Sequence, residues 1–350
     1  MFILATDLHL TDRPDDEYRF DLFPFLVGQV ESQKAKATFL LGDLTDFKDN
    51  HSAKLVNEVV NALTKISALC PLIILMGNHD YVDPGRPFFG FLNQINNITF
   101  VTKPTNLVVG GKDFLLLPHT RNPHKDWSKL DFAAPDFIMC HHTFKGAIAS
   151  NGQAMDGEEA GQVLGQTKAK VFSGDIHVPQ TLGPINYVGS PYRIRFGDVY
   201  KPRCVLLSDS KQTTDIHLQT IQKHTVYLDS PEELMAAPGL VSGDQVKIRF
   251  RLKREDAHLW PSIRKEIVAY AEGGGLKLHG LEAILDGSGN KLADNDGLDE
   301  SSQVVRQNRR GWTKLDLFDA YCNKEEVSEY DQDTGRALIE NFDTRVPTEA

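Results

Sequence analysis

The sequence has little cysteine and no long apolar run, and both absences narrow the class of protein. Only four cysteines (Cys70, Cys140, Cys204 and Cys322) occur in 350 residues, with no CxxC pair. This usage indicates buried thiols in a reducing compartment rather than a disulfide framework. No run approaches the roughly 20 apolar residues of a membrane span. Met1–Ala5 has neither a basic lead nor a long apolar stretch, so we expect no secretion signal.

An excess of positive charge is also missing. The formal net charge is −10, which argues against a protein that binds nucleic acid over its whole surface. The charge is uneven, because residues 281–350 hold 16 Asp and Glu against 8 Lys and Arg, which places −8 of the −10 there. The preceding region is close to neutral and has room for a local basic surface.

Residues 1–215 alternate short apolar runs with polar loops, a pattern typical of an α/β layered domain. Strand-like composition is predicted for several segments, and helical spacing for one. The predicted strands are Phe2–Ala5, Thr38–Leu41, Leu72–Met76, Leu107–Val109, Phe114–Leu117, Phe137–Cys140, Lys170–Phe172, Asn186–Val188 and Cys204–Leu207, and the predicted helix is Asn57–Leu69.

Residues 221–286 indicate a second, smaller α+β domain. Its most regular segment alternates apolar residues with Lys247, Arg249, Arg251 and Lys253, which predicts a half-buried strand with one basic face. Residues 287–311 are polar and predict a linker. Residues 312–350 predict short amphipathic helices.

Five of the predicted strands are followed directly by polar groups of a similar kind. The groups are Thr6-Asp7-Leu8-His9, Gly42-Asp43, Gly77-Asn78-His79-Asp80, His141-His142 and Gly174-Asp175-Ile176-His177. One such group is more often a simple turn, but five in this position indicate a shared site. In an α/β sheet, sites gather at the carboxyl ends of the strands.

The residue types predict a site for two divalent metal ions. The candidate ligands are Asp7, His9, Asp43, Asn78, His141, Asp175 and His177. Carboxylate, imidazole and amide ligands without thiolate suit Mn²⁺, Fe²⁺, Zn²⁺ or Mg²⁺. Seven ligands are too many for one ion, whereas two ions that share Asp43 use them all. Two ions about 3.5–4 Å apart generate hydroxide and neutralise phosphoryl charge, which is a standard way to hydrolyse phosphate esters.

These residues resemble the calcineurin-like metallophosphoesterase superfamily, whose pattern is DxH, GD, GNH followed by D or E, H, and GHxH. The resemblance covers about residues 1–200 and implies a four-layer α-β-β-α sandwich, here with a small α+β capping domain and C-terminal helices. It implies that one ion is held by Asp7, His9 and His177, the other by Asn78, His141 and Asp175, with Asp43 as the bridge. His79 would act on the phosphate or the leaving group as a general acid or charge stabiliser, and Asp80 would orient its ring.

Asp175 departs from the family pattern, which usually has histidine there. A carboxylate at this position would favour Mn²⁺ or Mg²⁺. The alternatives are that Asp175 weakens the second site or points away from it. Mn²⁺ is therefore the first expectation, with Mg²⁺, Fe²⁺ and Zn²⁺ as alternatives.

The segment Gly189–Asp198, GSPYRIRFGD, is similar to one found in SbcD-type nucleases, including phage recombination endonuclease subunits. The resemblance implies DNA as substrate, an SMC-like ATPase partner bound by the C-terminal helices, a homodimer, and a cytoplasmic location (the host cytoplasm for a phage protein). The candidate DNA contacts are Tyr192, Arg193, Lys247, Arg249, Arg251 and Lys253. Their alternatives are packing for Tyr192 and a solvated strand face for the basic strand.

Three functions fit these observations. The leading hypothesis is a metal-dependent DNA exonuclease or endonuclease that acts in repair, recombination or DNA degradation with an ATPase partner. The second is a small-molecule phosphodiesterase or phosphatase, with the C-terminal region as a lid over the substrate. The third is a DNA-end-binding scaffold with a degenerate metal site, a hypothesis suggested by the departure from the family pattern at Asp175.

Overall fold

Two six-stranded sheets and one four-stranded sheet make up the part of the chain that the structure describes. The computed structural model describes residues 1–165, 167–285 and 291–292, the last two by their backbone alone. The predicted linker, apart from Lys291–Leu292, and the predicted helical tail lie outside the described residues. Every helix within those ranges is too short or too polar to span a bilayer.

The first sheet has the order β12-β11-β1-β2-β3-β4. Strands β1 to β4 run parallel to one another. Beyond β1, β11 pairs antiparallel with β1, and β12 pairs antiparallel with β11. Its strands are β1 (Phe2–Ala5), β2 (Ala37–Leu40), β3 (Leu72–Leu75), β4 (Ile98–Val101), β11 (Cys204–Leu207) and β12 (Thr213–Ile216). The connections carry η1 (Pro14–Asp21), α1 (Leu22–Gln33), α2 (Ala53–Ser67) and η2 (Phe88–Gln94), where η denotes a 3-10 helix.

The second sheet has the order β5-β6-β7-β8-β10-β9. Its four central strands run parallel, and β5 and β9 are antiparallel edges. Its strands are β5 (Thr105–Val109), β6 (Lys112–Leu117), β7 (Phe137–His141), β8 (Lys170–Gly174), β9 (Gln180–Leu182) and β10 (Ile185–Tyr187). Two short helices, α3 (Pro123–Asp126) and α4 (Ala160–Leu164), lie in its connections.

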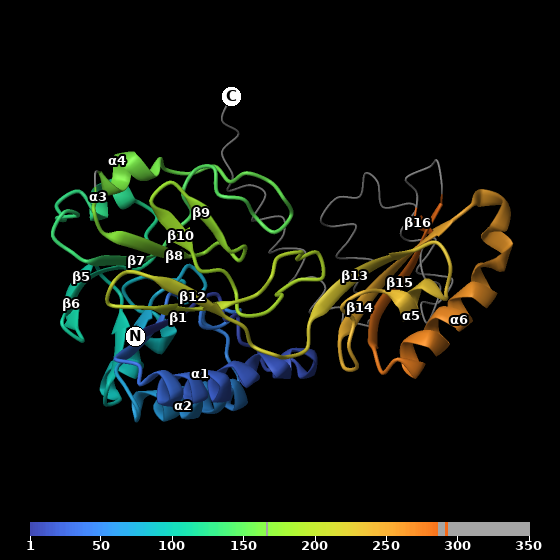
Figure 1. The fold of residues 1–350 in the computed structure, drawn as a ribbon, viewed down its shortest axis with the longest axis horizontal. Helices are drawn as coiled ribbons and strands as arrows, with labels where there is room; N and C mark the ends of the chain where they lie inside the picture. Colours follow the sequence, from blue (N-terminus) through green and yellow to red (C-terminus); the bar gives the residue numbers. More distant parts are fainter. Residues whose placement is uncertain (166, 286–290, 293–350) are drawn as a thin grey trace, which may run out of the picture. The chain divides into compact units, whose positions relative to one another are not determined.

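The two sheets lie face to face with helices on their outer sides, which gives a four-layer α-β-β-α arrangement (Figure 1). Phe2 and Phe39 of the first sheet pack against Phe114 and Phe137 of the second. The intervening residues of each strand point the other way and pack against the outer helices and loops. The α/β sandwich predicted from the sequence is therefore present. The parallel strands of both sheets have their carboxyl ends at the same edge of the sandwich.

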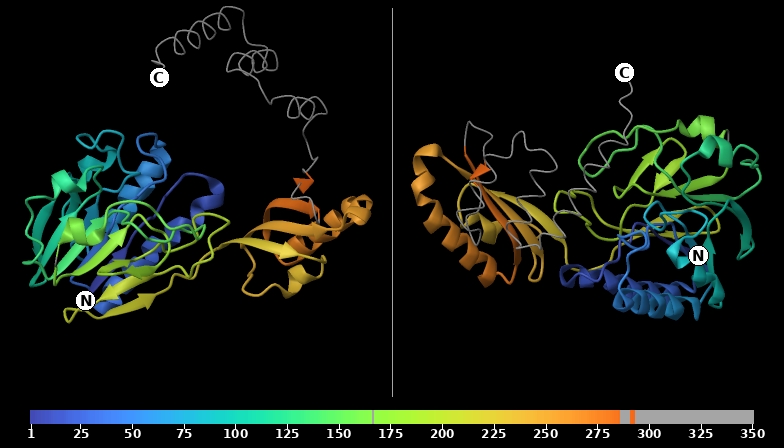
Figure 2. Two further views of the ribbon diagram at one scale, coloured as in Figure 1. Left: turned by 90° about the horizontal axis from the view of Figure 1, so that it is seen from above. Right: turned by 180° about the vertical axis from the view of Figure 1, so that it is seen from behind.

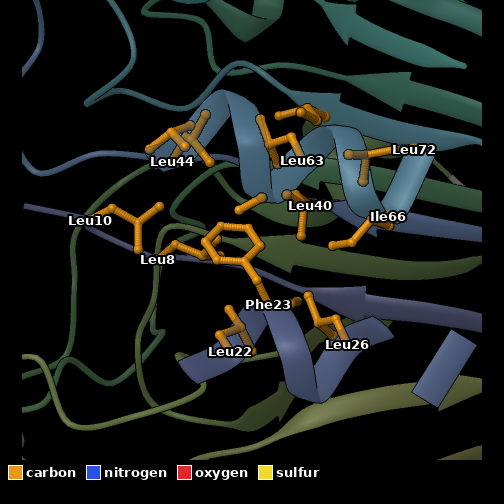
Figure 3. Close-up of a cluster of buried hydrophobic side chains, with 14 of the residues drawn as sticks. Leu8, Leu10, Leu22, Phe23, Leu26, Leu40, Leu44, Leu63, Ile66 and Leu72 are labelled. Atoms are coloured by element: carbon orange, nitrogen blue, oxygen red, sulfur yellow. The ribbon is translucent and has the colours of Figure 1, made fainter. Parts of the chain in front are cut away.

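The outer layer of the first sheet is built by α1 and α2, whose buried side chains meet in one cluster (Figure 3). Phe23 and Leu26 of α1 lie close to Leu63 and Ile66 of α2, and all four are buried. Burial of each such side chain contributes roughly 1.5–3 kcal/mol. The Ser52 hydroxyl caps α2 by accepting from the backbone N–H of Leu55. This layer fixes the strands whose ends carry the site.

The third sheet has the order β13-β14-β15-β16 (Figure 1, Figure 2). It has a hydrophobic cluster of its own. Its strands are β13 (Lys223–Leu228), β14 (Gln245–Leu252), β15 (Lys277–Leu285) and β16 (Lys291–Leu292), with α5 (Glu233–Ala236), η3 (Arg254–Leu259) and α6 (Trp260–Gly273) between them. The first three strands run parallel. β14 buries alternate apolar residues and leaves Lys247 and Arg251 exposed, as the sequence predicts for a half-buried strand.

A buried ion network joins the third sheet to the segment after β1. Lys223, at the start of β13, donates to the Asp16 carboxylate at 2.6 Å. Arg19 donates to the same carboxylate at 3.0 Å and also to the backbone carbonyl of His9. All three charged side chains are almost completely buried. The network therefore connects the start of the third sheet to a loop that carries predicted metal ligands.

Candidate metal centre

The predicted metal ligands lie on tight turns at the carboxyl ends of five strands. Asp7 and His9 follow β1, Asp43 follows β2, and Asp175 follows β8. These four residues have φ values of 53°, 43°, 54° and 78°, in the left-handed region that non-glycine residues rarely adopt. Each such residue costs about 1–3 kcal/mol and persists where its surroundings hold it, most often at functional sites. The turns therefore aim carboxylates and imidazoles at one point.

Two glycines make this convergence possible. A Cβ atom on Gly42, whose φ is +103°, would lie 2.2 Å from Nδ1 of His141. A Cβ atom on Gly174 would lie 2.6 Å from the carbonyl oxygen of Leu41. Both distances are far below van der Waals contact, so any larger residue would push the two sheets apart at the site.

Asp43 lies at the centre of the site and faces both predicted ligand groups. Its Oδ2 is 3.5 Å from Nε2 of His9, and its Oδ1 is 3.4 Å from Nε2 of His141. The backbone N–H of His79 donates to Oδ1 at 2.9 Å. One carboxylate thus presents an oxygen to each side, which is the geometry that a bridging ligand needs.

The first predicted group, Asp7, His9 and His177, is brought together as expected. One ligand atom from each of the three lies within 4.8 Å of the others. Nε2 of His9 is 3.1 Å from Nε2 of His177. Oδ2 of Asp7 is buried without a hydrogen-bond partner among the described residues, which is costly for a carboxylate unless a cation or a proton satisfies it.

The second predicted group is assembled around His141. Nε2 of His141 is 3.0 Å from Oδ1 of Asn78 and 3.8 Å from Oδ1 of Asp175. Nδ1 of His141 donates to the carbonyl of Leu41 at 2.5 Å, which leaves Nε2 as the free ligand atom. The other oxygen of Asp175 accepts from the Thr143 hydroxyl at 2.5 Å. Asp175 therefore turns one oxygen toward the site and anchors the other.

The donor set fits cations. Oδ1 of Asn78 lies 3.0 and 3.1 Å from the two carboxylate oxygens of Asp43 and 3.0 Å from Nε2 of His141. Acceptor atoms that face one another repel, unless the amide is reversed so that its NH₂ group donates or a positive ion lies between them. In the other ligand group, Oδ2 of Asp7 has no hydrogen-bond partner among the described residues, and Nε2 of His9 faces Nε2 of His177. Bound cations would account for both ligand groups, whereas a reversed Asn78 amide would account for only one, so cations are the simpler explanation. Carboxylate, imidazole and amide ligands suit hard or borderline divalent ions.

Without bound ions, burial and mutual charge shift the pKa values of these residues strongly. Burial raises the pKa of Asp7 to about 7, against the effect of the positive charge of His141. Burial alone would lower the pKa of His141, but the carboxylates of Asp43, Asp175 and Asp7 outweigh it and raise the pKa to about 9. The site therefore retains protons at neutral pH that ions would have to displace.

His79 lies at the mouth of the site, half-buried, with its ring centroid 4.8 Å from that of His9. Its Nδ1 lies 2.7 Å from the backbone carbonyl of Asp46, so Nδ1 carries a proton and Nε2 is available. The prediction that Asp80 orients this ring is wrong. The Asp80 carboxylate is fully buried and accepts from the backbone N–H groups of Asp43, Leu44 and Gly77, so it holds the two turns together instead.

Asp46 contributes more to the site than the sequence indicated. Its Oδ1 lies 3.4 Å from Nδ1 of His9, and its carbonyl accepts from His79. Ligand atoms of His9, Asp46 and His79 also lie within 4.8 Å of one another. The sequence places Asp46 in a polar run directly after Asp43, but only the fold shows that the loop turns back toward His9.

The structure corrects one predicted DNA contact and places the others. Tyr192 has no exposed surface and donates its hydroxyl to the carbonyl of Leu8, so it is a packing residue and not a DNA contact in this conformation. Arg251 pairs with Asp229 at 2.7 Å. Lys253 is exposed at the end of β14. Arg193, Lys247 and Arg249 line a common cavity.

That cavity, here called the basic cavity, has a volume of about 900 Å³. It lies between the segment after β10 and the third sheet, and its lining includes Arg193, Arg195, Phe196, His224, Tyr227, Lys247 and Arg249. The Lys247 ammonium lies 4.9 Å from the centre of the Phe196 ring. Burial, helped by the positive charges of His9 and Arg195, lowers the pKa of His177 to about 4 against the opposing effect of the carboxylates of Asp198 and Asp43. The backbone N–H of Ser190, three residues before Arg193, donates to the carbonyl of His177 at 3.0 Å, so the segment that leads into the lining of the basic cavity starts beside His177.

Residues 1–179, just over half of the chain, match the family of calcineurin-like phosphoesterases. An archaeal phosphodiesterase of solved structure is similar at 12% identity and a TM-score of 0.35, over 62% of this chain and 99% of that one. Yfce, a phosphoesterase from E. coli, is similar at 13% identity and a TM-score of 0.31, with the same coverage of both chains. No curated protein matches this chain significantly.

Proposed function

This chain belongs to the calcineurin-like phosphoesterase family, and on that premise we propose that it is a DNA nuclease of the SbcD type. The coarser activity, metal-dependent hydrolysis of a phosphate ester, follows from the family and the clustered Asp and His ligands. The proposal adds DNA as substrate, an SMC-like ATPase partner, Mn²⁺ as the preferred ion and a cytoplasmic location. The partner, the ion and the location rest on the resemblance of the segment Gly189–Asp198 and on the carboxylate at Asp175.

The arrangement of Asp43 carries the catalytic part of the proposal. Its two oxygens face His9 and His141 from between the two ligand groups, at 3.5 and 3.4 Å. When bound, two divalent ions supply a hydroxide nucleophile at neutral pH and neutralise charge on the phosphoryl oxygens. The chain's own part is to hold the ligands at fixed positions on strained turns and to exclude water below them.

His79 is placed to move a proton at the leaving group. The Asp46 carbonyl accepts from Nδ1, which fixes the ring and leaves Nε2 as the nitrogen that can exchange a proton with the substrate. A general acid of this kind contributes about 10²- to 10⁴-fold to the rate. His79 is half-buried, as are Asn78, Asp175 and His177, whereas Asp7, Asp43 and His141 are almost completely buried, so His79 is accessible to an entering phosphodiester.

The basic cavity supports a polynucleotide substrate over a small one. It combines Arg193, Arg195 and Lys247 with the aromatic ring of Phe196. Cations that contact phosphates, together with rings on which bases stack, are how proteins hold single-stranded nucleic acid. The chain as a whole is acidic, so a positively charged cavity beside the metal centre is not what the average charge of the chain would produce.

The test is cleavage of a labelled linear DNA duplex and a labelled single strand with Mn²⁺, Mg²⁺ and Zn²⁺ in turn. We expect Mn²⁺-dependent cleavage, a loss of about 10²- to 10⁴-fold in His79→Ala, and abolition in Asp43→Ala. Lys168→Ala, an exposed change before β8 at the opposite end of the sheet, is the control and should cleave normally.

Two other outcomes would replace the proposal. Hydrolysis of bis-p-nitrophenyl phosphate or a cyclic nucleotide without DNA cleavage under any metal would show a small-molecule phosphodiesterase. Salt-sensitive DNA binding without hydrolysis of any substrate would show a binding scaffold.

A further inference from the structure

A second cavity lies at the carboxyl edge of the sheets, on the other side of the metal centre. It has a volume of about 550 Å³, within the range of about 300–1,000 Å³ that is usual for small-ligand sites. Its lining comes from the loops after β3, β4 and β6 and includes Tyr81, Lys103, His119, Arg121, Lys125 and Trp127. We call it the Arg121 cavity.

The Arg121 cavity shares a wall with the second ligand group. Met76 lines it and directly precedes the turn that carries Asn78. The backbone N–H of His119 donates to the Met76 carbonyl at 2.8 Å, and the His119 ring centroid is 6.2 Å from that of His141. A group held in this cavity is therefore a close neighbour of a phosphate held at the metal centre.

The walls combine an apolar lining with a positive rim. Pro84, Pro104 and Pro118 supply apolar surface. Lys103, Arg121 and Lys125 are exposed cations at the rim, while the carboxylate of Asp126 accepts a hydrogen bond from Thr120. Apolar walls with a few polar or charged groups are typical of a site that takes an organic ring and fixes its charged substituent.

Two observations show that this wall is a built structure. The Tyr81 hydroxyl and Nδ1 of His119 form a hydrogen bond of 2.8 Å, and the Arg121 guanidinium lies 5.8 Å from the centre of the Tyr81 ring. The indole N–H of Trp127 is buried and has no hydrogen-bond partner among the described residues. Because this nitrogen has no accessible surface, Trp127 lines the cavity through its other atoms.

The geometry points to a subsite for the nucleotide next to the scissile phosphate, on the side of Asn78 and His141. Its base and sugar would contact the apolar walls, and its outer phosphate would contact Arg121 and Lys103. In the second sheet, β10 and β6 flank β8 and β7, so the strands that carry His141, Asp175 and His177 lie between the strands whose following segments line the basic cavity and the Arg121 cavity. A strand that crosses the metal centre fills both cavities, whereas a mononucleotide ester fills one. This inference rests on the proposed function and narrows its substrate to a polynucleotide.

The test separates this subsite from the metal centre and from the nuclease activity. The variants are Arg121→Ala and Lys103→Glu, both exposed positions, and the matched control is Lys129→Ala, an exposed lysine outside the cavity lining. Binding of a fluorescein-labelled thymidine hexanucleotide is measured by anisotropy in EDTA. Hydrolysis of bis-p-nitrophenyl phosphate and of the p-nitrophenyl esters of thymidine 5′- and 3′-phosphate is measured with Mn²⁺.

We expect both variants to weaken hexanucleotide binding about tenfold or more, because each removes a charged contact to phosphate. Both variants should raise KM for one thymidine ester and leave the rate of bis-p-nitrophenyl phosphate hydrolysis within twofold of that of the unsubstituted protein. Lys129→Ala should stay within twofold of the unsubstituted protein with all substrates. Equal binding by Arg121→Ala and Lys129→Ala would overturn the subsite, and so would an equal loss on all three esters. Weaker hexanucleotide binding in a protein that cleaves no DNA would uphold the subsite and refute the nuclease function.

Discussion

Asp175 stands where the family usually has histidine, and its surroundings indicate what a carboxylate does there. Thr143 fixes one oxygen at 2.5 Å, and the other lies 3.8 Å from Nε2 of His141, on the side of the second ligand group. A carboxylate held in this way has one oxygen left for a cation. The anchored geometry thus favours ligation over the alternative that Asp175 points away.

Removal of this side chain tests the role directly. Asp175→Ala should bind one divalent ion where the unsubstituted protein binds two, because the second group loses an anionic ligand. Asp175→His, which restores the family pattern, should still bind two. Calorimetric titration with Mn²⁺ gives both stoichiometries, with the exposed change Asp156→Ala as the control. Two ions bound by Asp175→Ala would remove Asp175 from the ligand set.

Proton release is a second consequence at the scale of single residues. In the ion-free site, burial raises the pKa of Asp7 to about 7, and neighbouring carboxylates raise that of His141 to about 9 despite its burial. Ions bind the deprotonated forms, so ion affinity should rise with pH from 6 to 9 and should fall as the pH drops through the pKa of Asp7. At pH 7, loading should release about one to two protons. Calorimetry in buffers of different ionisation enthalpy measures this number, and a value of zero would contradict the prediction.

At the scale of elements, most strands of the two larger sheets were predictable because their apolar runs are continuous, whereas β4, β9 and β12 were not predicted. The nine strands predicted over residues 2–207 are all present, with ends within two residues of the predicted ones. The helix predicted at Asn57–Leu69 is α2, Ala53–Ser67, whose start is set by the Ser52 cap. The sequence did not predict α1, because Pro24 and Gly28 resemble breakers. Pro24 lies in the first helical turn, where its missing N–H has no partner to lose.

The ligand set was predictable for the same reason, since each ligand directly follows a buried strand. The roles of Asp80 and Tyr192 were not, because they depend on which loops meet in space. Asp80 is next to His79 in sequence but bonds to a turn 36 and 37 residues earlier. Tyr192 looked accessible beside Arg193, yet it packs below the loop of Leu8. Contacts between loops of distant sequence carry no local signal.

The network of Asp16, Arg19 and Lys223 gives a prediction about how the elements support one another. Asp16→Ala would leave both cations buried without their carboxylate, and loss of one partner from a buried ion pair costs about 3–5 kcal/mol. The same change should weaken metal binding, because Arg19 also holds the carbonyl of His9. Urea unfolding measures the stability. Asp15→Ala, at the exposed neighbour, should change it by less than about 0.5 kcal/mol.

At the scale of the whole molecule, the distribution of charge decides where nucleic acid can bind, more than the net charge does. Residues 281–350 carry −8 of the net −10, so residues 1–280 carry only −2. Within them, cations line both the basic cavity and the Arg121 cavity beside the metal centre. A nearly neutral body with local basic cavities should bind nucleic acid at that place and not over its whole surface.

The salt dependence of binding tests this distribution. The logarithm of the affinity for single-stranded DNA falls with the logarithm of salt concentration, with a slope of about −0.7 per phosphate contact. The double variant Arg195→Ala/Lys247→Ala removes two cations of the basic cavity, so its slope should be shallower by about 1.4. Lys168→Ala, whose exposed charge lies before β8 and outside both cavities, should leave the slope unchanged. Equal slopes for all three proteins would mean that DNA is held by charges elsewhere on the chain, and the basic cavity would then no longer support a DNA substrate.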